Sequence, residues 1–413
     1  MKKVKYILIS LIIPVIINAS GGSLYTRIGV GDYYNTNSAR RLAIGGLGAA
    51  VADVEHISLY NPASLYRLGI TRVETGVNFN GFNIEGSTNS AFYSQAQFSG
   101  VTIGFPIDHD YGVSLAFGML PVTNVNYEVR NPVTNSLGTY NEIYLGEGGI
   151  TKFFAGSSYK LPFNFILGAS VDYYIGKILY SSKIDFGESA SGNNAEFIRE
   201  NSYHGFGTTL GLISSDLSHS IGIDEIKDFR FGLVFNYVSN ITTDSTLSTV
   251  SSVGTDVYEE GSFDTKLPFR LGAGLSFKLN ENYLIIADYL YQPWSDFEAS
   301  NSKSNSLKDL QRLSAGLEYK DAKSVFNGTF WEQIILRCGL SFEQTQYLIN
   351  ATEIDQFSVH AGVGMPVGVG NFLDISFEYG TRGETGINLF KENFYKAAVS
   401  INFGELWFQR FDR

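Results

Sequence analysis

The sequence predicts an all-β fold: a transmembrane antiparallel β-barrel of about 14 strands with an N-terminal plug inside its lumen. One observation is a two-residue alternation of apolar with small or polar residues, clear in YGVSLAFGM (residues 111–119) and FRLGAGLSFKL (residues 269–279). Because successive side chains of a strand point to opposite faces, each stretch has one apolar face. A second observation is length, since a membrane strand needs about 9–11 residues and ordinary strands average about 5 or 6. The third is an export signal at the start of the chain.

That signal is a predicted signal peptide over residues 1–19. Three lysines form its positively charged start, residues 6–17 form an apolar run, and Ala19 with its neighbours offers small residues for cleavage. A transmembrane helix needs about 20 apolar residues, so we expect removal of this segment and not anchoring. An exported barrel of this kind is expected in the bacterial outer membrane, in contact with its lipid.

Residues 20–70 are predicted to form the plug. The alternation is absent up to about Tyr66, and the segment is rich in glycine, asparagine and arginine. A barrel lumen wide enough for a solute is often filled by such a segment. The alternative is a flexible periplasmic tail, although the content of small apolar residues argues against disorder.

Residues 71–413 are predicted to form the barrel. A single-chain bacterial barrel has an even number of strands, so we expect fourteen, with one candidate miscounted or belonging to the plug or a loop. The candidates are residues 72–82, 91–105, 111–120, 122–131, 148–160, 164–180, 203–213, 229–241, 268–279, 282–292, 312–320, 332–342, 356–367, 371–381 and 394–403. Long polar connections, expected to face outward, are residues 132–147, 185–202, 242–264, 294–309 and 343–355. The stretch YKAAVSINF, followed by Trp407, Phe408 and Phe411, predicts the strand that closes the barrel.

Composition excludes several classes of function. The formal net charge of −11 at pH 7 disfavours nucleic acid as a partner. Cys338 is the only cysteine, so neither an internal disulfide nor a four-cysteine zinc site is expected. No Walker loop, zinc spacing or dinucleotide fingerprint is present, and we expect no metal and no cofactor. Ser/His coincidences, such as Ser358 with His360 or His219 with Ser220, are expected by chance in a serine-rich chain, so no enzyme is predicted.

Four cations lie out of phase with the apolar residues of their strands and are expected to point into the lumen: Arg230, Arg270, Lys278 and Arg337. They could hold the carboxylate of a ligand, for which arginine is geometrically suited. They could equally pair with the acidic residues of a polar lumen, for which the candidates are Asp288, Glu318, Asp374 and Glu378.

Two blocks of sequence resemble the FadL/TodX family of outer-membrane channels for long-chain fatty acids and other hydrophobic compounds. The first is GGLGAAVADVEHISLYNPASLYRL, residues 45–68, which contains the Asn61, Pro62, Ala63 element. The second is LPFRLGAGLSFKLNENYLIIADYLYQPWSDF, residues 267–297, which ends near Trp294 and Ser295. The resemblance implies a fourteen-stranded barrel, an N-terminal plug, and a passive route in which an apolar ligand leaves laterally through the wall.

The expected function is therefore passive uptake of hydrophobic small molecules, such as long-chain fatty acids, by a barrel that is a monomer by default. Lateral release needs a break in strand pairing, which Pro106 or Pro121 could mark, although each could also end a strand. The alternative is a FadL-like scaffolding or docking barrel in an envelope or protein-secretion assembly. A transporter needs an apolar cavity of a few hundred Å³, on the order of known ligand pockets, whereas a scaffold can be filled solid and would show conspicuous apolar loops outside. A general porin would have an open lumen and no plug.

Overall fold

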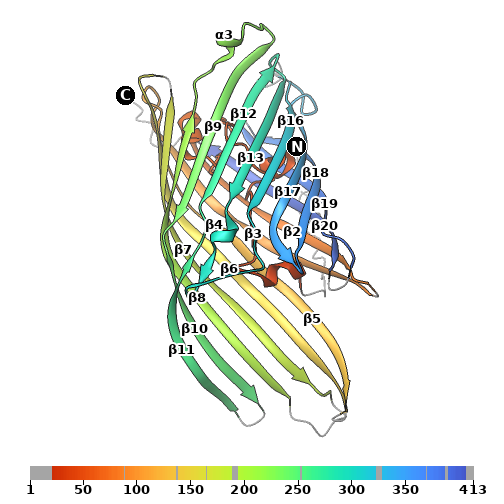
Figure 1. Ribbon diagram of the computed structural model, residues 1–413. Coiled ribbons are helices and arrows are strands. Elements are labelled where there is room, and N and C mark those ends of the chain that lie inside the picture. The colour runs from red at the N-terminus through yellow and green to blue at the C-terminus, as the bar shows by residue number, and fades with distance from the viewer. Residues whose placement is uncertain are drawn as a thin grey trace, which may run out of the picture.

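The computed structural model describes residues 21–405, apart from 88, 136–137, 164, 188–193, 252–253, 322–327, 369 and 387–388. The predicted signal peptide and the aromatic residues after Glu405 lie outside the described residues. The chain forms a closed barrel with antiparallel neighbours throughout (Figure 1). Its last strand pairs with its first from Thr71–Glu405 to Glu85–Lys391, so the wall has no free edge at the closure.

The predicted count of fourteen wall strands is confirmed. Residues 111–120 and 122–131, counted separately in the sequence, are two halves of one long strand interrupted at Val122, and this accounts for the surplus candidate. The wall consists of β2 (Thr71–Glu85), β3 (Ser90–Asp108), β4 (Val113–Pro121) continued by β5 (Thr123–Asn135), β6 (Gly138–Lys160), β7 (Ile166–Asp185), β8 (Ala195–Ile213), β9 (Ile226–Val238), β12 (Arg270–Leu279), β13 (Tyr283–Gln292), β16 (Leu310–Tyr319), β17 (Ile335–Ile349), β18 (Thr352–Gly368), β19 (Asn371–Arg382) and β20 (Lys391–Glu405).

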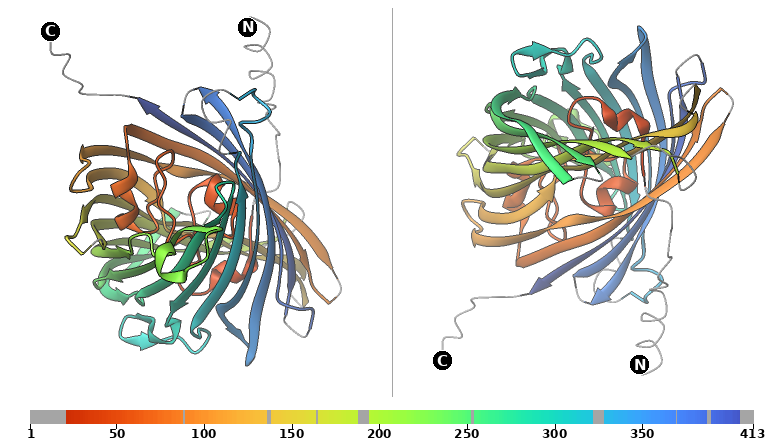
Figure 2. Two further views of the ribbon diagram at one scale, coloured as in Figure 1. Left: turned by 90° about the horizontal axis from the view of Figure 1, so that it is seen from above. Right: turned by 90° about the horizontal axis from the view of Figure 1, so that it is seen from below.

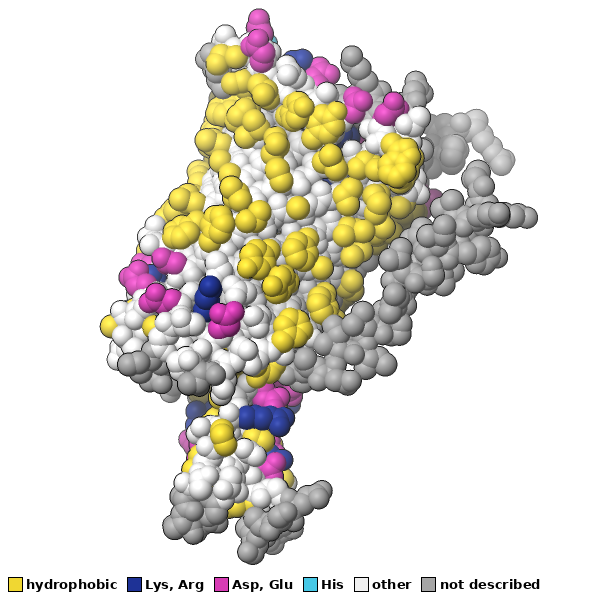
Figure 3. All heavy atoms as spheres, turned by 90° about the vertical axis from the view of Figure 1, so that its right-hand side faces the viewer, with side chains coloured by type: hydrophobic (Ala, Val, Ile, Leu, Met, Phe, Trp, Pro, Cys, Tyr) yellow, Lys and Arg dark blue, Asp and Glu magenta, His cyan; other side chains and the backbone are white. Residues whose placement is uncertain are grey.

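Side chains alternate across the wall as the sequence pattern predicts. On β16, Leu313 and Leu317 point outward and are 57% and 37% exposed, while Arg312 and Glu318 point inward and are buried. Figure 3 shows hydrophobic side chains spread over the outer surface of the barrel. Such an apolar outer surface fits lipid, and the protein is an outer-membrane barrel. Among the described residues, no helix is long and apolar enough to cross a membrane.

Part of the sheet continues beyond the barrel as a tongue (Figure 1, lower end). The tongue consists of β10 (Ile241–Ser251), β11 (Gly254–Lys266) and the adjoining ends of β5 to β8. Near the barrel β8 pairs with β9, and farther out it pairs with β10. The opposite end of the molecule has short turns such as residues 109–112 and 280–282, which by the usual rule makes it the periplasmic end and the tongue extracellular.

The tongue corrects an expectation from the sequence. Residues 132–147, 185–202, 242–264 and 343–355 were expected to be long polar connections, but the described residues in these ranges lie largely in paired strands. Much of the tongue is solvent-exposed rather than lipid-facing, so its strands do not need an apolar outward phase. Their serine, threonine and valine content is nevertheless compatible with strand structure.

The N-terminal residues 21–70, here called the inner segment, lie inside the barrel (Figure 2). The inner segment contains η1 (Leu24–Arg27), β1 (Asp32–Tyr33), α2 (Ala39–Ala43) and η2 (Pro62–Arg67). Elements outside the wall and inner segment are α3 (Ser218–Ile221), η3 (Trp294–Asp296), β14 (Glu298–Ala299) and β15 (Ser302–Lys303). Apolar residues of the inner segment, including Leu24, Tyr25 and Leu47, belong to the main hydrophobic core.

Candidate functional site

The inner segment fills much of the lumen, and it approaches the wall most closely at glycines whose Cα faces inward. At several inward positions a Cβ would overlap the inner segment: Gly168 faces Pro62–Ala63, Gly232 faces Ala49–Ala50, and Gly316 faces Ile44. The same holds for Gly211, Gly339 and Gly362, on three further strands. We call these six residues the glycine belt. Its members lie in the inward phase of their strands, so the inner segment is fitted to the wall backbone without intervening side chains.

The Asn61, Pro62, Ala63 element of the inner segment packs against this belt. The side-chain amide of Asn61, fully buried, donates to the carbonyl oxygens of Ala49, Leu212 and Leu233 at 2.6, 3.1 and 3.3 Å. Its oxygen accepts from Ala63 N at 3.0 Å and thereby caps η2. One side chain thus joins the inner segment to β8 and β9, because Leu212 and Leu233 belong to those strands.

A buried ion network joins the inner segment to the wall toward the periplasmic end. Glu318 accepts from Arg40 Nε at 2.9 Å and from Arg337 Nε at 2.7 Å, so one carboxylate is shared by an arginine of α2 and an arginine of β17. Arg337 Nη1 also lies 2.5 Å from Asp374 Oδ1, whose partner oxygen contacts His56 Nε2 at 2.9 Å. All five side chains are at most 7% exposed.

The same network includes Asp53 of the inner segment, 2.7 Å from Arg40. Burial alone would raise the pKa of Asp53, but the positive charges of Arg40, His56 and Lys320 outweigh it and hold that pKa well below its usual value. Asp53, Glu55 and His56 offer atoms close enough to share a metal ion. Arg40 and Lys320 already neutralise the two carboxylates, so these residues fit an ion network better than a cation site.

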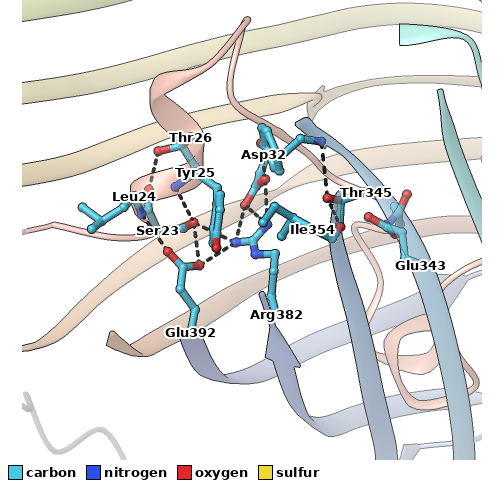
Figure 4. A network of polar contacts seen from close by, with 12 residues as sticks. Ser23, Leu24, Tyr25, Thr26, Asp32, Glu343, Thr345, Ile354, Arg382 and Glu392 are labelled. Carbon is cyan, nitrogen blue, oxygen red and sulfur yellow. Dashed lines mark hydrogen bonds and ion pairs between the residues drawn. The ribbon is translucent and has the colours of Figure 1, made fainter. Parts of the chain in front are cut away.

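A second polar cluster, which we call the latch, fixes the start of the inner segment at the extracellular end (Figure 4). Arg382 of β19 pairs with both oxygens of Asp32 at 3.0 and 3.1 Å, and with Glu392 of β20 at 3.0 Å. Glu392 also accepts from Ser23 Oγ at 2.8 Å and from Leu24 N at 2.9 Å. Burial alone would raise the pKa of Asp32, but Arg382 outweighs it and the pKa is lowered.

The four cations expected in the lumen do point inward, but they do not converge on one place. Arg337 belongs to the ion network, Arg230 donates to Tyr66 Oη at 2.5 Å, and Arg270 donates to Asn35 Oδ1 at 3.0 Å. Lys278 and Arg230 line one cavity toward the periplasmic end, and Arg270 lines another. Pairing within the protein therefore accounts for Arg337 and, through an ion pair with Asp228, for Arg230. Binding of a ligand carboxylate by any of the four stays a prediction.

The expected acidic partners behave unequally. Glu318 and Asp374 pair with arginines, and Glu378 lies 3.6 Å from Lys396. Asp288, in contrast, accepts from the backbone N–H groups of Gly48 and Ala49, both at 2.8 Å.

The sequence did not identify the latch residues, because charges at the ends of strands look like ordinary surface charges until the inner segment is placed beside them.

The barrel wall divides on one side, at a place we call the wall parting. β3 pairs with β4 from Asp108 only as far as Val101, which is opposite Met119. Beyond that point β5 pairs with β6 and, at Thr123 and Asn124, with β1 of the inner segment. Within the described residues no backbone pairing joins β3 to β5. The parting begins beside Pro121, while Pro106 lies within the β3–β4 pairing at a register shift.

Side chains bridge the wall parting. Gln97 Nε2 donates to Asn124 Oδ1 at 2.7 Å, and Tyr93 Oη donates to the carbonyl oxygen of Glu128 at 3.3 Å. Behind the parting lies a cavity of about 130 Å³, and its lining mixes aromatic, polar and charged groups such as Tyr33, Tyr34, Tyr60, Arg41 and Arg270. The cavity toward the periplasmic end is also about 130 Å³ and is lined by charged residues that include Asp53, Arg67 and Lys320.

The close fit at the glycine belt leads to a direct prediction. Gly168→Ala is expected to lower the free energy of unfolding by about 1–3 kcal/mol, because the added methyl group meets the Pro62–Ala63 backbone, which has no flexible end to move. The measurement is the denaturant midpoint of the protein refolded in detergent. Gly261→Ala on β11 is the matched control, since nothing lies within 4 Å of its Cβ position. Equal midpoints for the two variants would show that the belt is loosely packed.

Comparison with known proteins adds family and fold. A family model described as BamG matches residues 1–412. No curated protein matches the sequence. The solved structures that resemble the chain include the Pseudomonas putida toluene transporter TodX (TM-score 0.60, 17% identity, 88% of this chain and 97% of that one). They also include the Ralstonia pickettii toluene transporter TbuX (0.59, 16%, 94% and 99%) and a Pseudomonas aeruginosa FadL homologue (0.57, 13%, 89% and 97%). The expected FadL/TodX resemblance therefore holds for the fold.

Proposed function

This chain belongs to the BamG family, and from that premise we propose that it is a scaffolding barrel, a subunit that anchors and presents an extracellular sheet within an outer-membrane assembly. The observation that carries the proposal is the filled lumen. At the glycine belt the inner segment touches the wall backbone on six strands, and the ion network and the latch fix it at two further levels.

The sizes of the cavities support this choice over uptake of long-chain fatty acids. Pockets for ligands of that size measure about 300–1,000 Å³ and are mostly apolar. The cavities behind the wall parting and toward the periplasmic end are each about 130 Å³ and carry charged groups in their linings. A long acyl chain would need the inner segment to move, against buried ion pairs whose disruption costs about 3–5 kcal/mol each.

The proposal predicts a defined complex. Extracted from its native outer membrane in mild detergent, the chain is expected to appear by native mass spectrometry in a larger species of fixed composition. Replacement of residues 244–262 by a two-residue Asn-Gly turn removes the outer part of β10 and β11 but leaves the barrel intact, so it tests the tongue alone. A chain that is monomeric under these conditions and saturably binds hydrophobic probes would contradict the scaffolding function.

The wall parting favours a second candidate, lateral passage of small hydrophobic compounds into the membrane. The cavity behind the parting, about 130 Å³, is close to the roughly 150 Å³ cavity known to bind benzene. An exit into lipid keeps apolar surface out of water, which is favourable by about 25 cal/mol per Å². A compound with one aromatic ring has about the size of this cavity. Because part of the lining is charged, such a compound would have to pack against the tyrosine side chains.

Sealing the wall parting separates the two candidates. In a Cys338→Ser background, Gln97→Cys and Asn124→Cys place thiols on both sides of the parting for a short bismaleimide cross-link. For a scaffold, the cross-linked protein keeps its native complex, and uptake of radiolabelled toluene by cells is unchanged. For a channel, uptake falls at least tenfold while the complex persists. The same variant without cross-linker controls for the substitutions.

A further inference from the structure

One edge of the extracellular tongue is open along β11. Within the described part of the chain, Gly254–Lys266 pairs with β10 on one side, and only Thr265 and Lys266 are paired on the other, with β14. The outward N–H and C=O groups of an antiparallel edge strand are free for alternate residues, and they form a template for another strand. The side chains from Gly254 to Ser262 are all exposed.

The chain itself shows that this edge accepts an antiparallel strand. β14 pairs with Thr265 and Lys266, and Ser300 N donates to the carbonyl oxygen of Asp264 at 3.2 Å. There β14 turns away, because Ser300 and Asn301 have φ values of 53° and 59°. A bulge on β11 leaves Tyr258 without a partner on β10, and Asp264 is already paired with Ser300, so the regular open run is Glu259–Phe263.

The other edge of the tongue, β5, is protected. Near the barrel, Asn126 N is satisfied by Thr26 Oγ1 at 3.2 Å, and the carbonyl oxygen of Glu128 accepts from Tyr93. Farther out, Pro132 has no N–H to offer. Natural sheets blunt their edges in these ways, and β11 has no proline along its open run. The two edges of one sheet therefore differ: β5 is protected at its backbone groups, whereas β11 carries acidic side chains and a bulge and keeps the backbone groups of its open run unpaired within the described residues.

The acidic side chains of β11 determine which kind of partner strand its open edge can bind. β11 carries Asp256, Glu259, Glu260 and Asp264 and no cation before Lys266. Pairing two copies of this edge antiparallel would bring the acidic residues of both strands close together, and like charges directly opposite are destabilising. A strand with lysine or arginine at alternate positions has the complementary charge. Next to the open run, Tyr258 and Val257 are 67% and 57% exposed and offer apolar contact area for the same partner.

We propose that the β11 edge, Glu259–Phe263 with Tyr258 beside it, binds a basic extended segment of another extracellular protein as an added antiparallel strand. The backbone supplies the hydrogen bonds, the acidic side chains supply the selectivity, and Tyr258 supplies an apolar anchor. This inference rests on the proposed scaffolding function, and it places the binding of a partner at the open edge of β11.

Hydrogen exchange in the native complex tests the backbone pairing. Alternate amides of residues 259–263 are expected to exchange at least tenfold more slowly in the native complex than in the isolated refolded chain. Unchanged exchange in an intact complex would overturn the β11 inference and leave the scaffolding function standing. A chain that forms no complex in its native membrane would overturn both.

Charge reversal tests the selectivity. Glu259→Lys with Glu260→Lys is expected to weaken retention of the partner at least tenfold at low salt. The matched control is Glu142→Lys with Glu147→Lys on β6, which makes the same charge change on a strand paired on both sides. Raising the ionic strength should weaken the wild-type complex. It should also reduce the difference in partner retention between the β11 double variant and the β6 double variant. Equal loss from both double variants would show a general charge effect and contradict docking at β11.

Discussion

Replacement of Glu318 by glutamine is expected to lower the free energy of unfolding by about 3–5 kcal/mol, because it leaves two buried arginines without their shared charge. Arg40 of the inner segment and Arg337 of the wall both bind this carboxylate. Glutamine has nearly the same size, so the change removes charge without opening a cavity. The measurement is denaturant unfolding of the refolded protein, followed by tryptophan fluorescence, to which Trp294, buried in the core, contributes.

The control for Glu318→Gln is Glu281→Gln, which removes the same charge from an exposed pair. Lys227 and Glu281 are 2.9 Å apart with side chains 51% and 66% exposed. Exposed pairs contribute about 0–1 kcal/mol, so this variant should unfold close to the wild type. A loss of less than about 1 kcal/mol for Glu318→Gln as well would mean that the buried network is not what holds the inner segment.

Arg382→Ala is expected to release the start of the inner segment while the barrel stays folded. The substitution leaves Asp32 and Glu392 facing each other without the cation between them, a loss of about 3–5 kcal/mol for a buried network. The released segment should become a substrate for protease added to detergent-solubilised protein, with cleavage after Arg27 by trypsin as the readout. Its rate is expected to rise at least tenfold.

Two variants make the latch test specific. Arg382→Lys keeps the charge but loses the two-pronged contact with Asp32, so cleavage should be intermediate. Lys303→Ala removes an exposed cation that contacts Asp296 and should behave as wild type. If trypsin cleaves the wild type as fast as Arg382→Ala, the latch does not hold this segment closed.

The wall could be predicted from sequence because burial and lipid contact impose a two-residue period. On β16, and on β17 as far as Gln344, the outward leucines and inward charges follow that period. The period failed at two places for physical reasons. At Pro121–Val122 one strand changes its neighbour on one side, and the sequence pattern there predicts two strands. In the tongue, solvent replaces lipid, so the outward-facing side chains of its strands do not need to be apolar.

The interior was less predictable than the wall. The inward phase of Arg337 and Glu318 could be read from their strands, but their pairing depends on the position of Arg40, which the sequence does not give. The glycine belt was visible as glycines in the inward phase, such as Gly316 and Gly339. Its meaning became apparent only with the inner segment in place, because a glycine in a strand also marks bulges and bends.

The latch has a consequence for how the molecule is made. Ser23 and Glu392 hydrogen-bond to each other although 369 residues separate them in the chain. This contact cannot form until β19 and β20 have been synthesised and brought next to β2, so the start of the inner segment can be fixed only after the last strands are in place. Contacts of such long range are slow to form, and a half-closed barrel exposes strand edges meanwhile. Seating of the N-terminus is thus a late step of biogenesis and reports that the barrel has closed.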